Sequence, residues 1–255
     1  MTEIRGIYTL WLREVKRYVR DRARIVSSFV QPLLWLVIFG SALSALVRIS
    51  IPGLTYQQYI FPGIIGQTLL FTSMFIGISV IWDREFGFLK EIMVAPISRF
   101  SVFAGKLLGA STDAMIQGIF VFVLGALLGI TSNPLILGEA LPVMILITFG
   151  LVSIGLTVAS FMQSLESFGL IVNFINMPMF FLSGAIFLIR GPGVPSWLQI
   201  VASLNPFTYA VDALRTVILG GSWQPLYPLY VELLVVTCFD LAMIAIGTWA
   251  FGRRK

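Results

Sequence analysis

Histidine is absent from this sequence of 255 residues, cysteine occurs once, at position 238, and charged residues make up only 11% of the chain. Without histidine the chain lacks the commonest general base, the commonest metal ligand and any Ser-His-Asp triad. A single cysteine excludes an intrachain disulfide and a cysteine-based metal cluster. Soluble domains average about 25% charged residues, so these charges are too few to cover a water-exposed surface. The composition excludes an ordinary soluble enzyme, and we predict no catalytic and no metal-binding residues.

Long apolar stretches are present instead, and 58% of the residues are hydrophobic. A membrane-spanning helix needs about 20 predominantly apolar residues. Six stretches meet this requirement: 25–47, 59–81, 107–130, 140–162, 168–189 and 228–251. The sequence therefore predicts an all-α polytopic membrane protein, with a six-span domain over residues 25–255 after an N-terminal segment, 1–24.

The distribution of basic residues predicts the orientation of these spans. All but three of the lysines and arginines fall in the segments 1–24, 82–106 and 253–255, whereas Arg48, Arg190 and Arg215 lie in links on the opposite side. Basic residues concentrate in cytoplasmic loops, so both termini are predicted to be cytoplasmic. The net charge of +5 then reflects topology, and we predict no nucleic-acid partner.

Residues 1–24 form two helical stripes. Apolar and aromatic residues recur every three or four positions, and basic residues do so on another face; the two sets are Ile4, Ile7, Tyr8, Trp11, Val15 and Tyr18, and Arg13, Lys16, Arg17, Arg20 and Arg24. This pattern predicts an amphipathic helix lying in the lipid headgroup layer. The alternative is a set of basic residues that only flank the first span.

The cytoplasmic link between the second and third spans also carries a helical pattern, over residues 84–93. Phe86, Leu89 and Met93 share one stripe, and charged residues surround it. Pro96 ends this helix, and Ser98 is predicted to cap the next one. A charged helix with an apolar ridge suggests a docking element; the alternative is a solvated connector.

The external link 190–227 is too apolar for a plain solvated loop. It predicts two short helices, 195–204 and 207–219, with Asn205-Pro206 between them and Gly220-Gly221 after the second. Each helix is too short to span, so both are predicted to re-enter the outer leaflet, where protein or water satisfies their backbone ends.

Three motifs in this order resemble the type-2 exporter permeases of ATP-binding-cassette (ABC) transporters. The first is Arg84-Glu85-x-Gly87-x-Leu89 followed by Ala95-Pro96-x-Ser98-Arg99, which looks like the family's cytoplasmic loop. The second, residues 181–187, resembles the end of its fifth span, and the third, residues 204–215, resembles the motif before its last span. The chain departs from the family at Leu188-Ile189-Arg190, where many members have a proline.

The resemblance implies a plasma-membrane permease without catalytic activity of its own, which exports a drug, a lipid or a lipid-linked glycan. The sequence contains no G-x-x-x-x-G-K-[ST] motif, so ATP and Mg²⁺ would be bound by two copies of a separate ATP-binding subunit. A second permease would complete the transporter; it is expected to be another copy of this chain, and the alternative is a paralogous permease. The implied coupling residues are Arg84, Glu85, Phe86, Gly87, Leu89, Lys90, Glu91, Met93, Pro96 and Arg99, and the implied outer-gate residues are Asn205, Pro206, Tyr209, Asp212 and Arg215.

A few polar residues lie within the predicted spans. Asp240 is near the middle of the last span, and Asn173 and Asn176 lie three positions apart in the fifth. Ionisable and amide groups at this depth are costly and mark functional sites, so these three are candidate pathway residues. Alternatively, the acid is protonated or bonded across an interface, and the amides hold helices together. Cys238 is predicted to be buried.

Two other functions fit a six-span chain less well. Water and glycerol channels carry two Asn-Pro-Ala half-helices on opposite sides of the membrane, whereas Asn133-Pro134 and Asn205-Pro206 fall on one predicted side and are followed by bulky residues. An intramembrane protease would need a Ser–His dyad or a G-x-S-x-G motif, and neither occurs.

Overall fold

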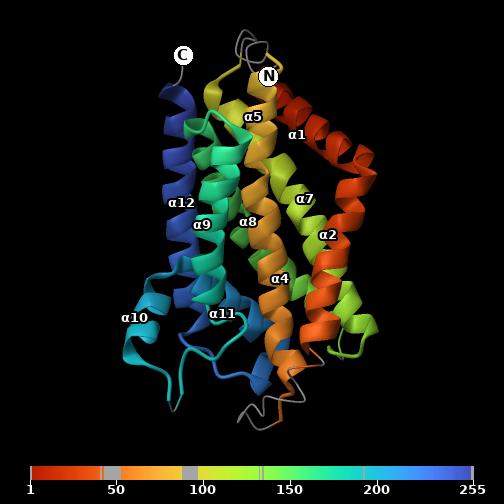
Figure 1. Cartoon of the computed structure of the whole chain (residues 1–255), viewed down its shortest axis with the longest axis vertical. Helices are drawn as coiled ribbons and strands as arrows, with labels where there is room; N and C mark the ends of the chain where they lie inside the picture. The colour runs from red at the N-terminus through yellow and green to blue at the C-terminus, as the bar shows by residue number, and fades with distance from the viewer. Residues whose placement is uncertain are drawn as a thin grey trace.

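The computed structural model describes residues 2–40, 42, 53–87, 97–131, 133, 135–191 and 193–253, and every regular element in these ranges is helical. Figure 1 shows an elongated bundle in which α1 (Thr2–Arg20) and the C-terminal end of α12 (Leu229–Arg253) lie at the same end. We call this the inner end, because the sequence predicts cytoplasmic termini, and the opposite one the outer end.

The first two helices cover one flank of the bundle. A break at Asp21 separates α1 from α2 (Arg22–Leu34), which continues into the π-helix η1 (Trp35–Phe39). The aromatic rings of Phe29 on α2 and Phe120 on α7 stack with centroids 4.0 Å apart, which holds α2 against the bundle. The remainder of the predicted first span, beyond residue 42, lies outside the described residues.

The centre of the bundle is built from four helices: α4 (Tyr56–Phe75), α5 (Gly77–Glu85), α7 (Arg99–Leu127) and α8 (Ile136–Phe161). The helix α8 contacts α4, α5, α7, α9, α11 and α12. Ser98 caps α7 as predicted, because its hydroxyl accepts a hydrogen bond from the Ser101 backbone N–H.

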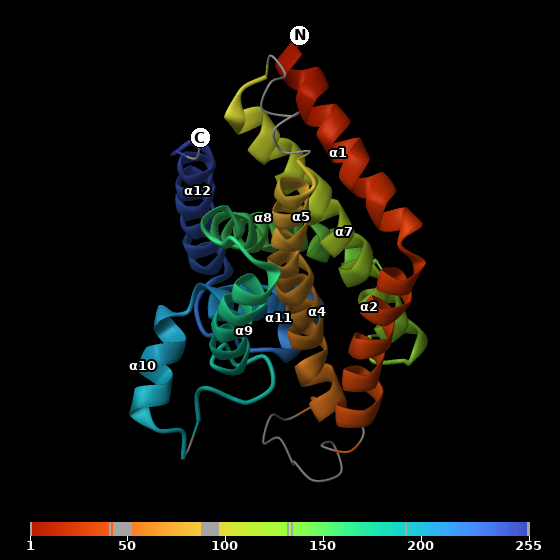
Figure 2. The same cartoon turned by 45° about the horizontal axis from the view of Figure 1, so that its top comes forward.

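The two short helices predicted before the last span are confirmed as α10 (Ser196–Leu204) and α11 (Pro206–Leu219). Asn205 caps α11 by accepting the Phe207 backbone N–H at 3.0 Å. Gly220, with a φ of +53°, ends α11 before the short 3₁₀ turn η2 (Gly220–Ser222). Figure 2 shows α10 standing out from the bundle at the outer end, while α11 lies against α4. Their insertion in a leaflet stays a prediction.

The fifth apolar stretch ends earlier than predicted. The sequence predicts a span over 168–189, whereas α9 runs only over Leu165–Phe181. Past Phe181 the chain turns, because Gly184 adopts a φ of +78° and its carbonyl accepts a hydrogen bond from the Tyr59 hydroxyl at 2.9 Å. Apolar composition cannot reveal such a turn, since the residues up to 189 stay hydrophobic.

Four helical stretches among the described residues are long and apolar enough to cross a membrane: Tyr56–Glu85, Arg99–Leu127, Ile136–Phe161 and Leu229–Gly252. Two other apolar helical stretches, Ile25–Ile38 and Leu165–Phe181, are shorter. The chain is therefore an all-helical polytopic membrane protein. The count of six spans remains a prediction.

Glycines allow α8 to approach the junction of α4 and α5. A Cβ atom added to Gly155 would lie 2.6 Å from the backbone carbonyl oxygen of Met74. A Cβ on Gly77 would in turn collide with the Gly155 carbonyl and the Phe168 ring. Because backbone atoms cannot move aside as a flexible side chain can, the contact depends on these glycines.

We therefore expect Gly155→Ala to destabilise the protein by about 1–3 kcal/mol through overpacking. Gly138→Ala is a matched control in the same helix, because a Cβ at Gly138 meets nothing within 4 Å and alanine favours the helix. Thermal unfolding in detergent micelles should show a lower Tm for Gly155→Ala and an unchanged or higher Tm for Gly138→Ala. Equal Tm values would contradict the packing.

Candidate functional site

The N-terminal helix α1 packs along α7 at the inner end. Leu10, Glu14 and Tyr18 form the buried stripe of α1, at helical spacings of four residues. The Trp11 indole N–H donates to the Thr112 hydroxyl of α7 at 3.0 Å. Ile4 and Tyr8, from the predicted apolar face, are exposed. A helix is present over Thr2–Arg20, but it ends before the predicted residue 24 because the helical backbone is interrupted at Asp21; its place in the headgroup layer stays a prediction.

Two glycines of α7 make this contact close. A Cβ atom on Gly105 would lie 2.7 Å from the Leu10 Cβ, and one on Gly109 would lie 2.6 Å from the Glu14 Cβ. Their four-residue spacing places them on one face of α7, in the small-residue pattern that lets two helix backbones approach. The charged end of Glu14 is thereby brought to the side chain of Lys106.

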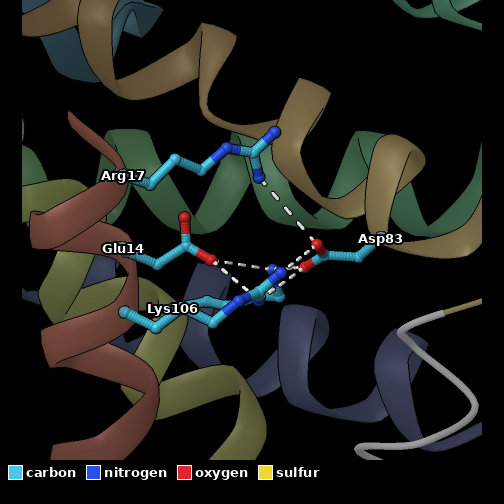
Figure 3. A network of polar contacts seen from close by, with 5 residues as sticks. Glu14, Arg17, Asp83 and Lys106 are labelled. Atoms are coloured by element: carbon cyan, nitrogen blue, oxygen red, sulfur yellow. Dashed lines mark hydrogen bonds and ion pairs between the residues drawn. The ribbon is translucent and has the colours of Figure 1, made fainter. Parts of the chain in front are cut away.

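Lys106 is the centre of a buried charge network (Figure 3). Its side chain is fully buried, and its Nζ lies 2.5 Å from Asp83 Oδ2 of α5 and 3.2 Å from Glu14 Oε1 of α1. Arg13 binds Asp83 through two hydrogen bonds, Nη2 to Oδ1 at 2.5 Å and Nη1 to Oδ2 at 3.1 Å. Arg17 completes the network, 3.9 Å from Asp83 Oδ1.

This network is energetically demanding. The free-energy cost of removing a charge from water is offset only when ion-pair and hydrogen-bond partners surround that charge with good geometry. Lys106 pairs with one carboxylate from each of two neighbouring helices. The Asp83 carboxylate pairs with Lys106 and also accepts two hydrogen bonds from the Arg13 guanidinium. Because Arg13, Glu14 and Arg17 lie on α1, Asp83 on α5 and Lys106 on α7, the network fixes these three helices relative to one another.

Glu3 fastens the other end of α1 to α7. Its carboxylate accepts the Ser98 backbone N–H at 3.0 Å and the Ser98 hydroxyl at 2.8 Å, and it also accepts the Ser101 hydroxyl. The hydrogen bonds from Ser101 and then Ser98 hold the pKa of Glu3 below its ordinary value of 4.5. A carboxylate at a helix N-terminus is also favoured by the helix dipole.

Only some of the predicted coupling residues are among the residues that the structure describes. Arg84 and Glu85 form the end of α5, and Gly87, with a φ of +76°, follows the helix. The predicted helix 84–93 thus does not begin as expected, because its first two residues still belong to the span. The Arg84 guanidinium donates to the Met162 and Ala159 carbonyls at the end of α8, at 2.5 and 3.3 Å.

Phe86 is 83% exposed at the inner end, and Arg99 is exposed in the first turn of α7. The other coupling residues lie outside the described residues; they are Leu89, Lys90, Glu91, Met93 and Pro96. The role of all ten stays a prediction.

The predicted outer-gate charges meet at the outer end. Arg215 is 2% exposed, and its Nη1 lies 3.8 Å from Asp212 Oδ1. The hydrogen bonds of Arg215 go instead to the carbonyls of Tyr59 and Gly184, at 3.3 and 3.0 Å. Asp212 in turn accepts the Trp223 indole N–H at 2.9 Å. The pair therefore ties α11 to α4 and to the loop after α9.

The remaining outer residues join the two short helices to the bundle. Asn205 donates from its amide to the Met179 carbonyl of α9 at 2.8 Å, and Pro206 occupies the first position of α11. The Tyr209 hydroxyl donates to the Ser203 carbonyl of α10 at 2.8 Å.

The three candidate pathway residues do not share one surface. Asn173 is exposed on α9, whereas Asn176 is fully buried and its amide has no hydrogen-bond partner among the described residues. Asp240 is buried on α12 against Gly150 of α8, in a small cavity that Pro206 and Phe207 also line. Their role in a pathway stays a prediction. Cys238 is exposed on α12, so the prediction that it is buried was wrong.

The comparisons with known proteins agree with the motifs. A family model described as ABC-2 type transporter matches residues 5–219. The chain belongs to this family.

Curated relatives of this ABC-2 permease are transport proteins and nodulation proteins by name. A chain of Cyanophora paradoxa named as a transport permease, ycf38, is 32% identical over 226 residues, which cover 86% of this chain and 76% of that protein. Nodulation protein J of Rhizobium meliloti is 26% identical over 91% of this chain and 87% of its own length. YbhR of Escherichia coli, named as a multidrug ABC transporter permease, is 27% identical over 80% of this chain and 54% of its own.

Sequence reasoning on this ABC-2 permease missed the inner charge network. Lys106 enters the sequence analysis only among the basic residues that predict the orientation of the spans, and neither Asp83 nor Glu14 is singled out there. A usable signal was present, since Glu14 is an acid four positions before Tyr18 of the apolar stripe and Lys106 directly precedes a predicted span. Their meeting depends on tertiary packing across 92 positions of sequence, which no local pattern contains.

Replacing the central lysine tests the network. We expect Lys106→Met to leave Glu14 and Asp83 incompletely paired and to cost about 3–5 kcal/mol in the docking of α1. Hydrogen exchange read by mass spectrometry should then show faster exchange in α1, because an undocked helix opens more often. Lys16→Met, an exposed position on α1, should leave exchange unchanged. Equal exchange in the two variants would exclude Lys106 as the anchor.

The lowered pKa of Glu3 predicts that the contact between Glu3 and the start of α7 depends on pH. A carboxyl whose pKa is lower in the folded state contributes stability fully above its ordinary value of 4.5, and that stability is lost as the pH falls through the folded pKa. At pH 7 the first turns of α1 should therefore be better protected from exchange in wild type than in Glu3→Gln. This difference should vanish well below pH 4.5. A difference that persists in acid would show that the carboxylate charge is not responsible.

Proposed function

We propose that this permease is the membrane subunit of an ABC exporter in which a separate ATP-binding subunit hydrolyses ATP. Membership of the ABC-2 family supports this proposal, as does the absence of a phosphate-binding loop motif from the sequence. The observation that carries it is the charge network of Glu14, Asp83 and Lys106, which joins three helices at the inner end.

The segment 88–96 connects α5 to α7, and both of its attachment points are held by the inner contacts. On one side, Asp83 binds Lys106 and Arg13, while Arg84 binds the end of α8. On the other, Glu3 binds Ser98 at the start of α7. We propose that this segment docks on the ATP-binding subunit. A displacement there would pass to α1, α7 and α8 as rigid elements.

At the outer end, α10 and α11 are proposed to form the gate. Asn205 binds α9, Arg215 binds the carbonyl of Tyr59 in α4, and the cavity beside Asp240 adjoins the start of α11. Movement of the central helices would therefore reach α11 directly. A second copy of this chain and two ATP-binding subunits would complete the transporter, and the apolar character of the chain favours a hydrophobic or amphipathic substrate.

The exposed ring of Phe86 provides a test of docking. We expect Phe86→Asp to lower the yield of complex with the ATP-binding subunit at least tenfold, because it places a charge in an apolar contact. Phe187→Asp is the matched control, since Phe187 is 55% exposed but follows α9 toward the outer end. Co-purification and ATP hydrolysis of the purified complex are the measurements.

An equal loss of complex in both variants would indicate general misfolding in place of a lost docking contact. If no ATP-binding subunit co-purifies with the wild-type chain and the chain alone conducts water or ions, the transporter proposal fails. A six-span channel would then be favoured.

A further inference from the structure

A small polar cavity lies between α2, α4 and α7, three helices that run side by side (Figures 1 and 2). Its volume is about 240 Å³. The hydrogen-bonding groups that line it include the amides of Gln31, Gln67 and Gln117 and the hydroxyls of Thr68 and Thr72. Every lining residue is uncharged.

These polar groups are costly to bury, because they lie deep in the bundle. Gln67 lies in the middle of the helical stretch Tyr56–Glu85, and Gln117 lies well inside Arg99–Leu127, two of the stretches long enough to span a membrane. A polar side chain at this depth requires a partner or a function, because hydrocarbon offers it no hydrogen bond. Water and headgroups are too distant to serve either residue if the stretches span the bilayer.

Most of the lining groups are satisfied within the protein, but Gln67 is not. The Thr72 hydroxyl donates to the Gln117 carbonyl oxygen at 2.6 Å, and the Thr68 hydroxyl donates to the Ile64 carbonyl at 2.9 Å. The Gln67 side chain is only 6% exposed and lines the cavity, and no hydrogen bond joins it to another of the described residues. Its amide therefore offers two donors and an acceptor to an occupant of the cavity.

Aromatic and aliphatic groups flank the polar lining. The rings of Trp35, Phe71 and Phe75 border the cavity. Trp35 and Gln31 also border an apolar surface of α2, on which Val30 and Leu34 are about half exposed. A molecule with a polar head in the cavity and an apolar tail along α2 would match both surfaces.

We propose that this cavity binds the uncharged, hydroxyl- or amide-bearing head of an amphipathic molecule, and that Gln67 selects for it. An ion would find no counter-charge among the lining residues, so an ionic head would lose its hydration without compensation. A neutral hydrogen-bonding head gains the free amide of Gln67 instead. The binding site is formed by this chain alone. That the bound molecule is an exported substrate rests on the proposed function.

Photolabelling in membrane vesicles tests the site directly. The probe is dodecyl maltoside with a photoreactive diazirine in its chain, and labelled peptides are located by mass spectrometry. We expect labelling near Phe71 and Trp35 that excess dodecyl maltoside prevents and that dodecyltrimethylammonium, with the same tail and a cationic head, does not. Gln67→Leu should weaken labelling about tenfold, as for the loss of one hydrogen bond.

Two further variants separate the site from general effects. Gln199→Leu, on the exposed α10, should label as wild type does. Gln67→Glu keeps the size and the acceptors but adds a negative charge, so dodecyltrimethylammonium should now compete. Equal competition by both heads in wild type, or labelling that Gln67→Leu leaves unchanged, would overturn the proposal. ATP hydrolysis by the complex is measured separately, so its absence would refute the exporter function without removing the site.

Discussion

The ammonium group of Lys106, buried between Asp83 and Glu14, is the interaction on which the inner end of this permease depends. A lysine with no exposed surface is tolerated only if its charge is matched, and both matching carboxylates come from other helices. This requirement explains why α1 lies along α7 and why Gly105 and Gly109 face it, since larger residues would hold Glu14 too far from Lys106. The amphipathic helix is thus part of the permease core as well as a surface element.

The sequence sufficed for the membrane class, the helical content and several helix caps and stops, because each depends on local patterns. The cap at Ser98, the turn at Asn205-Pro206 and the stop at Gly220 are local backbone chemistry, and all three are found where predicted. The end of α9 was misplaced, since the turn at Gly184 is stabilised by Tyr59, 125 positions away. The charge network was missed for the same reason. A helix can be recognised from its own sequence, whereas the residues that it contacts across the bundle cannot.

The candidate site shows the same division. Phe86 and Arg99, two residues of the motif that predicts the coupling segment, lie at the inner end, and the role of the segment stays a prediction. The motif did not indicate that Arg84 binds the carbonyls of α8, because a basic residue in a charged run has the same sequence pattern whether it meets solvent or a helix end. Arg215 and Asp212, two of the implied outer-gate residues, lie 3.8 Å apart. Their stronger contacts, with backbone carbonyls and an indole, required the folded loops around them.

Paired charged groups lie at the two ends of the long axis of the molecule, and other buried polar groups lie between them. This distribution affects how the helices can move. The inner end is held by ion pairs among three helices and the outer end by a buried arginine bound to backbone carbonyls. Both sets of contacts would be expensive to break, so each end is expected to move as a unit. Between them, Gln67, Asn176 and Asp240 are buried in environments that do not pair them with an opposite charge. Amide groups such as those of Gln67 and Asn176 exchange hydrogen-bond partners at low cost, because no charge is left unpaired when one contact is lost. The middle of the bundle is therefore where the helices can shift against each other, and where a ligand can supply the hydrogen bonds that the protein leaves unmade.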